Sequence, residues 1–218
     1  MEIVKPSVEL LSITPNALGL IEMAGRTCYQ SEADAKMGPE PFVRKIMQLG
    51  HESVIEHASA TFRIICDRGV THEIVRHRLC SYSQESTRYV NYKKGIKVIR
   101  PPFKEQIAEH VWFVAMEDAE TAYRYLVENG EKPQIARSVL PNCLKTEIVM
   151  TANFREFRHF LHLRTSPAAH PQMREIAKMI EAELVKACPV CFEDIARCWP
   201  SDGSPNVCRF CRQPIKKG

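Results

Sequence analysis

The amino-acid sequence predicts an α+β fold, because strand-like and helix-like segments mix without the regular alternation of a doubly wound sheet. Residues 58–65 (ASATFRII) and 143–154 (CLKTEIVMTANF) alternate small or apolar with polar side chains, which is typical of strands. Residues 105–130 and 171–188 carry apolar side chains at helical spacing over several turns. A length of 218 residues allows one large core with at most a small appendage.

The N-terminal part of the chain predicts strands and helices separated by prolines. In order, we expect strands over 3–13 interrupted at Pro6, helices over 16–29 and 42–50, the strand 58–65, a helix over 68–80, a loop over 81–87 and a short strand over 88–92. Asp67 is a good N-cap for the helix over 68–80. The helix over 42–50 places Phe42, Ile46 and Leu49 on one apolar side, and Gly50 is its natural stop.

The C-terminal part predicts mostly helices. In order, we expect a long helix over 105–130 ended by Gly130, a short helix over 133–141, the strand 143–154, a helix over 153–164 and a last helix over 171–188. Within the helix over 153–164, Phe154, Phe157 and Leu161 form one apolar stripe.

Composition places the chain among ordinary folded proteins, with 44% hydrophobic and 26% charged residues. The net charge of +4 suits anionic small molecules but does not by itself imply nucleic acid. No segment approaches the roughly 20 apolar residues that span a bilayer, and the N-terminus lacks the apolar run of a signal peptide. We therefore expect a cytoplasmic protein, not bound to membranes, whose cysteines stay reduced.

A cationic cluster of Arg76, His77 and Arg78 lies on the helix predicted over 68–80. Consecutive helical residues are about 100° apart, so the three side chains would fan over roughly 200° and clamp anionic groups on two sides. The next residues add donors suited to phosphate oxygens and a pyrimidine ring: Ser81, Ser83, Gln84, Ser86, Thr87 and Arg88. A solvated charged face is the competing interpretation; the apolar neighbours Val75 and Leu79 argue against it, since they indicate a partly buried helix.

Two further segments concentrate titratable side chains. Residues 50–57 (GHESVIEH) do not follow the H-E-x-x-H pattern of zinc proteases, so hydrogen-bonded histidines in a capped loop compete with a metal site. In the helix over 153–164, Arg155 shares a face with His159, and Arg158 shares one with His162. For Arg158 and His162 we expect an exposed basic side without further role. No G-x-S-x-G occurs, so no serine has a nucleophile elbow.

Four segments, in this order, resemble the flavin-dependent thymidylate synthases. They are GHESVIEH, the triplet RHR followed after seven residues by Ser86, ARSVLP, and TANFREFRHFLHLR. The R-H-R-x7-S signature is specific, and the matches cover about residues 15–195. The resemblance implies a central mixed or antiparallel sheet flanked by helices, a domain over residues 1–195, and sites formed where chains meet in a homotetramer.

The resemblance also implies an activity. Family members make dTMP from dUMP: 5,10-methylenetetrahydrofolate donates the methylene group, and FADH2, regenerated by NADPH, supplies the hydride. The cofactor carries the redox chemistry, so the protein positions its ligands and stabilises charge. The chain is thereby expected to be an FAD-dependent methyltransferase without an enzyme nucleophile, in which Ser86 binds substrate and Cys80 packs. Nucleic acid is not an expected partner.

The resemblance assigns roles by position. Arg164 would sit at the pyrimidine and favour ionisation at its N3, which suits a permanently charged guanidinium. FAD would be held by Ser53, Arg76, His77, Arg78, Gln84, Asn153, Arg155 and His159. The nucleotide dUMP would be held by Glu73, Arg76, Gln84, Ser86, Thr87, Arg88, Arg137 and Arg164, with Arg137 reaching it from a neighbouring chain. His51 would line the place where folate or nicotinamide approaches.

Three of these positions depart from the family pattern. Gln84 stands where some members carry Glu, Glu73 where some carry Gln, and His159 where some carry Asn. His and Asn can both hydrogen-bond a flavin edge, whereas Gln84 replaces a carboxylate contact to nucleotide or flavin.

Residues 196–218 form a C-terminal extension that the resemblance does not explain. Cys188, Cys191, Cys208 and Cys211 follow a C-x2-C-x16-C-x2-C pattern, a usual spacing for a structural zinc ion held by four thiolates. The competing interpretation is packing, because family members commonly carry Cys before Pro at the position of Cys188.

Two other functions remain open. A nucleic-acid-binding zinc-knuckle protein could use the basic tail RFCRQPIKKG and the arginine-rich helix, but it has no need of R-H-R-x7-S. An enzyme of the same fold could transfer a different one-carbon unit to a pyrimidine nucleotide, which only product analysis separates from thymidylate formation.

Overall fold

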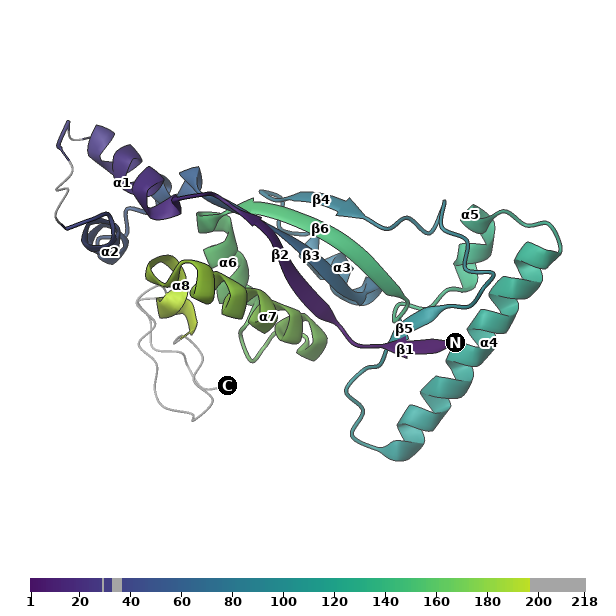
Figure 1. Ribbon diagram of the computed structural model, residues 1–218. Helices are drawn as coiled ribbons and strands as arrows, with labels where there is room; N and C mark the ends of the chain where they lie inside the picture. Colours follow the sequence, from purple (N-terminus) through teal and green to yellow (C-terminus); the bar gives the residue numbers. More distant parts are fainter. Residues whose placement is uncertain (29, 33–36, 197–218) are drawn as a thin grey trace. The chain divides into compact units, whose positions relative to one another are not determined.

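The computed structural model describes residues 1–28, 30–32 and 37–196 and has the expected α+β fold, an antiparallel sheet flanked by helices (Figure 1). The strands are β1 (Glu2–Val4), β2 (Ser7–Ile13), β3 (Ser59–Asp67), β4 (Ser81–Gln84), β5 (Lys97–Ile99) and β6 (Lys145–Asn153). The α-helices are α1 (Ala17–Thr27), α2 (Glu40–Gln48), α3 (Arg68–Ile74), α4 (Gln106–Glu128), α5 (Pro133–Ala136), α6 (Phe154–Arg164), α7 (Pro171–Ala187) and α8 (Pro189–Ala196). Two 3₁₀ helices complete the fold, η1 (Glu52–His57) and η2 (Arg137–Val139).

The main sheet has four strands in the order β2-β3-β6-β4. Its long strands form where the sequence alternates, and in β6 every second residue, from Thr146 to Ala152, is buried. The other face carries polar pairs between β3 and β6: the Thr61 and Thr151 hydroxyls lie 3.0 Å apart. The strands predicted over 58–65 and 143–154 are confirmed.

The chain divides into two compact units. The first contains Met1–Val8, Arg63–Arg76 and Tyr82–Val149, and the second contains Glu9–Phe62, His77–Ser81 and the described residues from Met150 onward. The first unit has α3, α4 and α5; the second has α1, α2, α6, α7 and α8.

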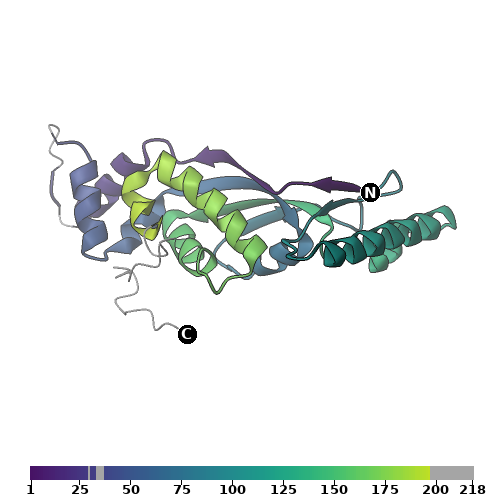
Figure 2. The ribbon, with the colours of Figure 1, turned by 90° about the horizontal axis from the view of Figure 1, so that it is seen from below.

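The second unit is built on α6. Its apolar stripe is fully buried, as predicted: the Phe157 ring meets the Phe62 ring of β3 edge-on at 5.3 Å, and Phe154 meets Phe192 of α8 at 5.0 Å. Next to it, α7 buries Met173, Ile176, Ile180 and Leu184 and packs against α6 and α8 (Figure 2). One side of α6 is thereby fixed in the core, which determines where its remaining side chains point.

The expectation of an exposed Arg158 is wrong. The residue is 1% exposed, and its guanidinium makes a two-pronged ion pair with Asp194 of α8, with both distances 2.7 Å. It also donates to the Cys191 carbonyl oxygen and to Glu52 of η1, the latter at 3.3 Å. The basic residues of this helix gave no sign that carboxylates from distant segments would cover Arg158.

In the first unit, the N-terminal residues of the chain contact both β5 and α4. Strand β1 pairs in parallel with β5, which was not predicted, in the register Glu2↔Lys97 to Val4↔Ile99. The Met1 ammonium donates to Glu120 of α4 at 2.6 Å, and the same carboxylate accepts from the backbone N–H of Ile96 at 3.0 Å. Ile96, Val98 and Leu144 form the local core with Trp112 and Met116 packed against it.

The helix predicted over 68–80 is confirmed only at its start, and placing Arg76, His77 and Arg78 on it was wrong. Asp67 caps α3 as expected, accepting from Val70 N–H at 2.7 Å. The helix ends at Ile74, however, because the Ile74 carbonyl accepts from the Tyr82 hydroxyl at 2.7 Å instead of continuing the helical ladder. The cationic triplet therefore lies in a turn, and its neighbour Leu79 is 77% exposed rather than part of a buried face.

Strand and loop are exchanged in the next segment. Residues 81–84, expected as loop, form β4 at the sheet edge, and residues 88–92, expected as a strand, form a turn and extended chain. The turn closes because the Ser86 carbonyl accepts from the backbone N–H groups of Tyr89 and Val90, at 3.1 and 3.0 Å.

Two smaller differences concern α2 and the C-terminal part. In α2 the buried residues are Val43 and Ile46, whereas Leu49 is 56% exposed. Gly50 and Gly130 follow α2 and α4 with φ of 76° and 93°, so both helix stops are as predicted. The last helix over 171–188 is confirmed, and α8 after it was not predicted.

Arg158→Met should lower the free energy of unfolding by about 3 kcal/mol, because removing a buried cation leaves its carboxylate partners uncompensated. Chemical denaturation of the full chain measures this. The matched control is Arg44→Met, since exposed Arg44 also pairs with a carboxylate of α8, Glu193; its unfolding midpoint should stay at the wild-type value. Equal midpoints for both variants would contradict the structural role of Arg158.

Candidate functional site

The candidate site in the second unit is built along α6. Asn153 starts the helix, and its side-chain oxygen accepts from the Glu156 N–H at 2.8 Å. With the phenylalanine stripe in the core, the same helix exposes Arg155 and His159, half-buries Arg164, and buries Glu156. Three of the expected ligand-binding residues, Arg155, His159 and Arg164, therefore lie on this one helix.

His77 is the residue of the cationic triplet that turns inward. It is 5% exposed, whereas Arg76 and Arg78 on either side are exposed. Its ring packs edge-on against Phe160 of α6, with ring centroids 4.8 Å apart, and near His159 at 5.7 Å. The inward side chain of the turn thus meets the part of α6 that carries His159, one of the expected ligand-binding residues.

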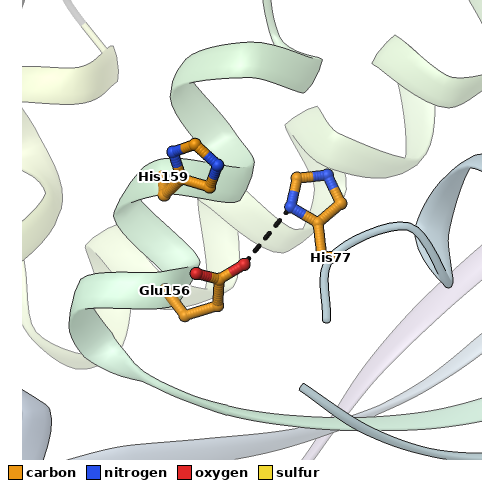
Figure 3. A group of neighbouring side chains, drawn as sticks. All are labelled: His77, Glu156 and His159. Atoms are coloured by element: carbon orange, nitrogen blue, oxygen red, sulfur yellow. Dashed lines mark hydrogen bonds and ion pairs between the residues drawn. The ribbon is translucent and has the colours of Figure 1, made fainter. Parts of the chain in front are cut away.

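Both ring nitrogens of His77 have partners on α6, and Figure 3 shows the one with Glu156. Nδ1 lies 3.3 Å from Glu156 Oε1, and Nε2 lies 3.1 Å from Arg164 Nε. An arginine Nε always carries a hydrogen and never accepts one. His77 Nε2 must therefore be the acceptor, so the proton of the neutral ring is on Nδ1, from which it donates to Glu156.

The charge states follow from burial. Burial, followed by the nearby Arg164 and His159, lowers the pKa of His77 to about 4, so its ring is neutral near pH 7. Burial raises the pKa of Glu156, while His159 acts in the opposite direction. The thiol of Cys80 lies 4.0 Å from the same carboxylate oxygen.

His77, Glu156 and His159 also resemble a metal site, since each offers a donor atom and these atoms lie within 4.8 Å of one another. A metal ion would need the lone pair of His77 Nδ1. The Arg164 contact already uses the lone pair of Nε2, and a neutral histidine ring then carries its proton on Nδ1. In this geometry the cluster is a hydrogen-bond chain from arginine through histidine to carboxylate.

The other expected flavin-side residues of the second unit lie on or beside η1, or in the turn. Arg155 donates to Glu56 of η1 at 2.5 Å. His51 and Ser53, at the start of η1, are exposed, as is Arg78. The acids of GHESVIEH pair with arginines of α6, which supports a structural rather than a metal-binding role for Glu52 and Glu56.

His51 borders a cavity of about 520 Å³ in the second unit. Its walls include Met37, Phe42 and Leu49, with Arg26 and Lys45 as cations. This explains why Leu49 is not in the core: it faces the cavity. The cavity could not be predicted from the sequence, because helical periodicity does not determine how α1 and α2 pack around it.

The expected nucleotide-side residues lie in the first unit. Buried Thr87 accepts from the Arg137 guanidinium at 3.3 Å, and Ser86 Oγ accepts from the Arg88 N–H at 3.3 Å. Arg137 and Thr87 line a cavity of about 510 Å³, together with Arg68, Gln134, Ile135 and Ser138. Arg137 was expected to serve a neighbouring chain; here it lies beside Thr87 of its own chain.

Arg68 was missed by the sequence analysis. It begins α3, directly after the Asp67 cap, and donates to the Glu85 carbonyl oxygen at 3.3 Å. Among the cavity-lining residues within the described part of the chain, two are arginines and none is acidic. A cavity of this kind suits a phosphate group.

Gln84 and Glu73 complete this group. The Gln84 amide donates to the hydroxyls of Thr71 and Thr146, at 2.9 and 3.2 Å, so both of its N–H donors are used within the chain. Glu73 is half-buried on α3. Arg76 is exposed and ends the segment Arg63–Arg76 of the first unit.

Two of the four predicted zinc ligands lie within the described residues. Cys188 and Cys191 are buried where α7 meets α8, with their thiols in hydrogen-bond contact, which lowers the pKa of Cys188. Cys208 and Cys211 lie outside the described residues.

Comparison with known proteins shows the family. The family model described as "Thymidylate synthase complementing protein" matches residues 9–190. A flavin-dependent thymidylate synthase of Mycobacteroides abscessus is 36% identical over 225 residues, which cover 93% of this chain and 89% of that protein. One of Geobacter sulfurreducens is 37% identical over 198 residues, covering 86% and 85%.

A solved structure agrees. A UMP/dUMP methylase, PolB, from Streptomyces cacaoi bound with 5-Br dUMP matches with a TM-score of 0.76 and 26% identity, over 88% of this chain and 96% of that one. The chain belongs to the flavin-dependent thymidylate synthase family. Within the described residues, none of the helices is both long and apolar enough to span a membrane.

The pKa of His77 predicts how stability depends on pH. Between pH 6.5 and about 4 the unfolded chain binds a proton at this histidine and the folded chain does not, so the free energy of unfolding falls as pH falls. Glu156, whose pKa is raised, acts in the opposite direction above pH 4.5. His77→Phe should therefore show a shallower fall between pH 6 and 5, by up to about 1.4 kcal/mol per pH unit.

The control for this measurement is His110→Phe, which changes an exposed histidine of α4 and should keep the wild-type slope. Denaturant unfolding at several pH values gives the slopes. An unchanged slope in His77→Phe would mean that the His77 pKa is not lowered in the folded protein.

Proposed function

We propose that this chain makes dTMP from dUMP as an FAD-dependent methyltransferase, with 5,10-methylenetetrahydrofolate as carbon donor and NADPH as reductant. The observation that carries the proposal is the arrangement at the end of α6, where neutral His77 holds the Arg164 side chain, in a chain that belongs to the flavin-dependent thymidylate synthase family. Support for the substrate comes from the relatives' name and from the solved methylase bound with 5-Br dUMP.

Arg164 is the residue proposed to act on the pyrimidine. Its guanidinium stays charged at all relevant pH values and would stabilise negative charge when the base is ionised at N3. No enzyme nucleophile is needed in this scheme. Cys80 is proposed to pack, and its thiol lies 4.0 Å from a carboxylate oxygen of Glu156. Ser86 is proposed to bind substrate, and its hydroxyl oxygen accepts from the backbone of Arg88.

FAD is proposed to be held mainly by residues of the second unit, and these fit an anionic dinucleotide. Arg78 and Arg155 are exposed cations, and Ser53 and His159 are exposed hydrogen-bonding groups. Buried His77 is proposed to contact the flavin, as is Asn153, whose side-chain oxygen already caps α6, so only its amide N–H groups remain to donate. Arg76 and Gln84 are the remaining residues proposed to contact FAD. Reduced FAD supplies the hydride of the reaction.

The nucleotide is proposed to bind with its phosphate at Ser86, Thr87, Arg88 and Arg137. The cavity beside Thr87 supports this, and we add Arg68 to the set because it lines the same cavity. Glu73, Arg76 and Gln84 are proposed to contact the rest of the nucleotide. The folate or nicotinamide is proposed to approach at His51, whose neighbouring cavity combines apolar walls with Arg26 and Lys45.

A homotetramer is proposed as the assembly. The first unit carries apolar side chains on the outside of α4, with Ile107 76% and Val111 63% exposed, and such a surface is suited to burial between chains.

The enzyme test is product analysis with dUMP, 5,10-methylenetetrahydrofolate, FAD and NADPH, and in parallel with UMP, because the similar solved protein is a UMP/dUMP methylase. We expect dTMP from dUMP, and bleaching of the flavin bands when NADPH is added anaerobically. A methylated product from UMP alone would favour a different pyrimidine methylase. No product from either nucleotide would contradict the proposal.

Arg164→Ala should lower turnover about 10²-fold or more while the purified protein keeps its FAD, because a charge-stabilising group is lost and the cofactor contacts are not. The control is Arg44→Ala, an exposed arginine of α2 in the same unit, which should keep wild-type turnover. Retained turnover in Arg164→Ala would remove this arginine from the mechanism.

The domain organisation is proposed as a catalytic domain over 1–195 and an extension over 196–218 that binds a structural zinc ion. The contact between the Cys188 and Cys191 thiols supports one half of such a site. Protein made with zinc supplied should contain one zinc per chain, and Cys191→Ser should lose it. Zinc-free wild-type protein by elemental analysis would contradict the site.

A further inference from the structure

Glu156 is a buried carboxylate in the candidate site for which the resemblance gives no role. It is 6% exposed, and it lies on the same turn of α6 as His159 (Figure 3). Its carboxylate meets His77 Nδ1 at 3.3 Å and the Cys80 thiol at 4.0 Å. A carboxylate is costly to bury, so one placed here needs a function or a partner.

The contacts of His77 bear on the function of Glu156. A neutral imidazole exists as two tautomers, and only the one protonated on Nδ1 leaves Nε2 free to accept from Arg164. The hydrogen-bond partners of the two ring nitrogens determine which tautomer forms. An ionised carboxylate can only accept, so Glu156 selects the proton on Nδ1.

We propose that Glu156 is a positioning residue: by accepting from His77 Nδ1 it fixes the tautomer whose Nε2 holds the Arg164 guanidinium in place. The distances of 3.3 Å and 3.1 Å form a continuous chain from carboxylate to guanidinium, across a ring packed on Phe160. The consequence for catalysis rests on the proposed function of Arg164; the tautomer itself does not.

The groups that face His77 all bear on its protonation. Arg164 and His159 on α6 disfavour a charged ring, and burial does so more strongly. Glu156 faces Nδ1 from α6, and Cys80 approaches the same carboxylate from the turn that carries His77. The ring should therefore stay neutral, with one tautomer, at any pH well above 4.

The first experiment measures the tautomer directly. The full chain with its bound flavin is labelled with ¹⁵N-histidine and studied by ¹⁵N NMR; the chain has 8 histidines, and His77 is assigned by its absence in His77→Asn. We expect Nδ1 at the shift of a protonated ring nitrogen and Nε2 at that of an unprotonated one, unchanged between pH 8 and 6. A ring protonated on Nε2, or on both nitrogens, overturns the proposal without any variant of Glu156.

The second experiment removes the carboxylate. In Glu156→Leu, Nδ1 loses its acceptor and the Nε2-protonated tautomer should appear; kcat should fall about 10²-fold, as for a misplaced catalytic group, with KM for dUMP and flavin content near wild type. The matched control is Glu181→Leu, because Glu181 is equally buried, at 6%, on the neighbouring helix α7. It should keep both the His77 signals and kcat.

The possible outcomes distinguish the tautomer assignment from the proposed function. If Glu156→Leu keeps the Nδ1-protonated ring, the proposal fails whatever its activity. If the tautomer changes but kcat does not, the ring does not position Arg164 for turnover, and the proposal fails in its catalytic part. If wild-type protein makes no dTMP but shows the expected tautomer and its change in Glu156→Leu, the proposed function fails and the tautomer assignment stands. If Glu156→Leu does not fold, the wild-type spectrum still decides the assignment.

Discussion

The buried guanidinium of Arg158 is the interaction on which the second unit depends. A guanidinium does not lose its proton in a protein, so a buried one must keep its carboxylates or pay several kcal/mol. Here the partners come from two other segments, Asp194 of α8 and Glu52 of η1. Any rotation or translation of α6 would separate at least one pair. The ion pairs therefore fix α6 relative to η1 and α8 more strictly than its phenylalanine stripe alone can, because apolar contacts are not directional.

This fixed helix explains the arrangement of the candidate site. Arg155 and Arg158 pair with Glu56 and Glu52 of η1, which tie the solvent side and the core side of α6 to the same short helix. With the rotation set, helical spacing turns Glu156 toward the His77 turn and leaves His159 exposed one turn after Arg155. The structural acids of GHESVIEH thus serve the site indirectly, by holding the helix that carries it.

The sequence predicted those elements whose signals are local. Strands β3 and β6 and helices α4, α6 and α7 were found because their periodicity is uninterrupted, and the family segments were found from their motifs. The end of α3 was missed because no glycine or proline marks it, and its last carbonyl is satisfied by a hydroxyl eight residues away, that of Tyr82. Arg158 was misplaced because its partners are remote in sequence. Glu156, three residues after the Asn153 cap, has the position of an ordinary capping-box glutamate, and only the structure shows it reaching His77 instead.

The charge of Arg164 and the neutral state of His77 favour each other. The positive charge of Arg164 lowers the pKa of the ring, and the neutral ring that results has the lone pair that Arg164 requires. A protonated ring would place two N–H donors face to face and repel the guanidinium, so each partner stabilises the other only in this one protonation state. Burial favours the same neutral state of the ring, because a charged ring is costly to remove from water. A permanently charged guanidinium is thereby held in a defined orientation by a neutral acceptor, so the contact with His77 does not itself neutralise the positive charge of Arg164.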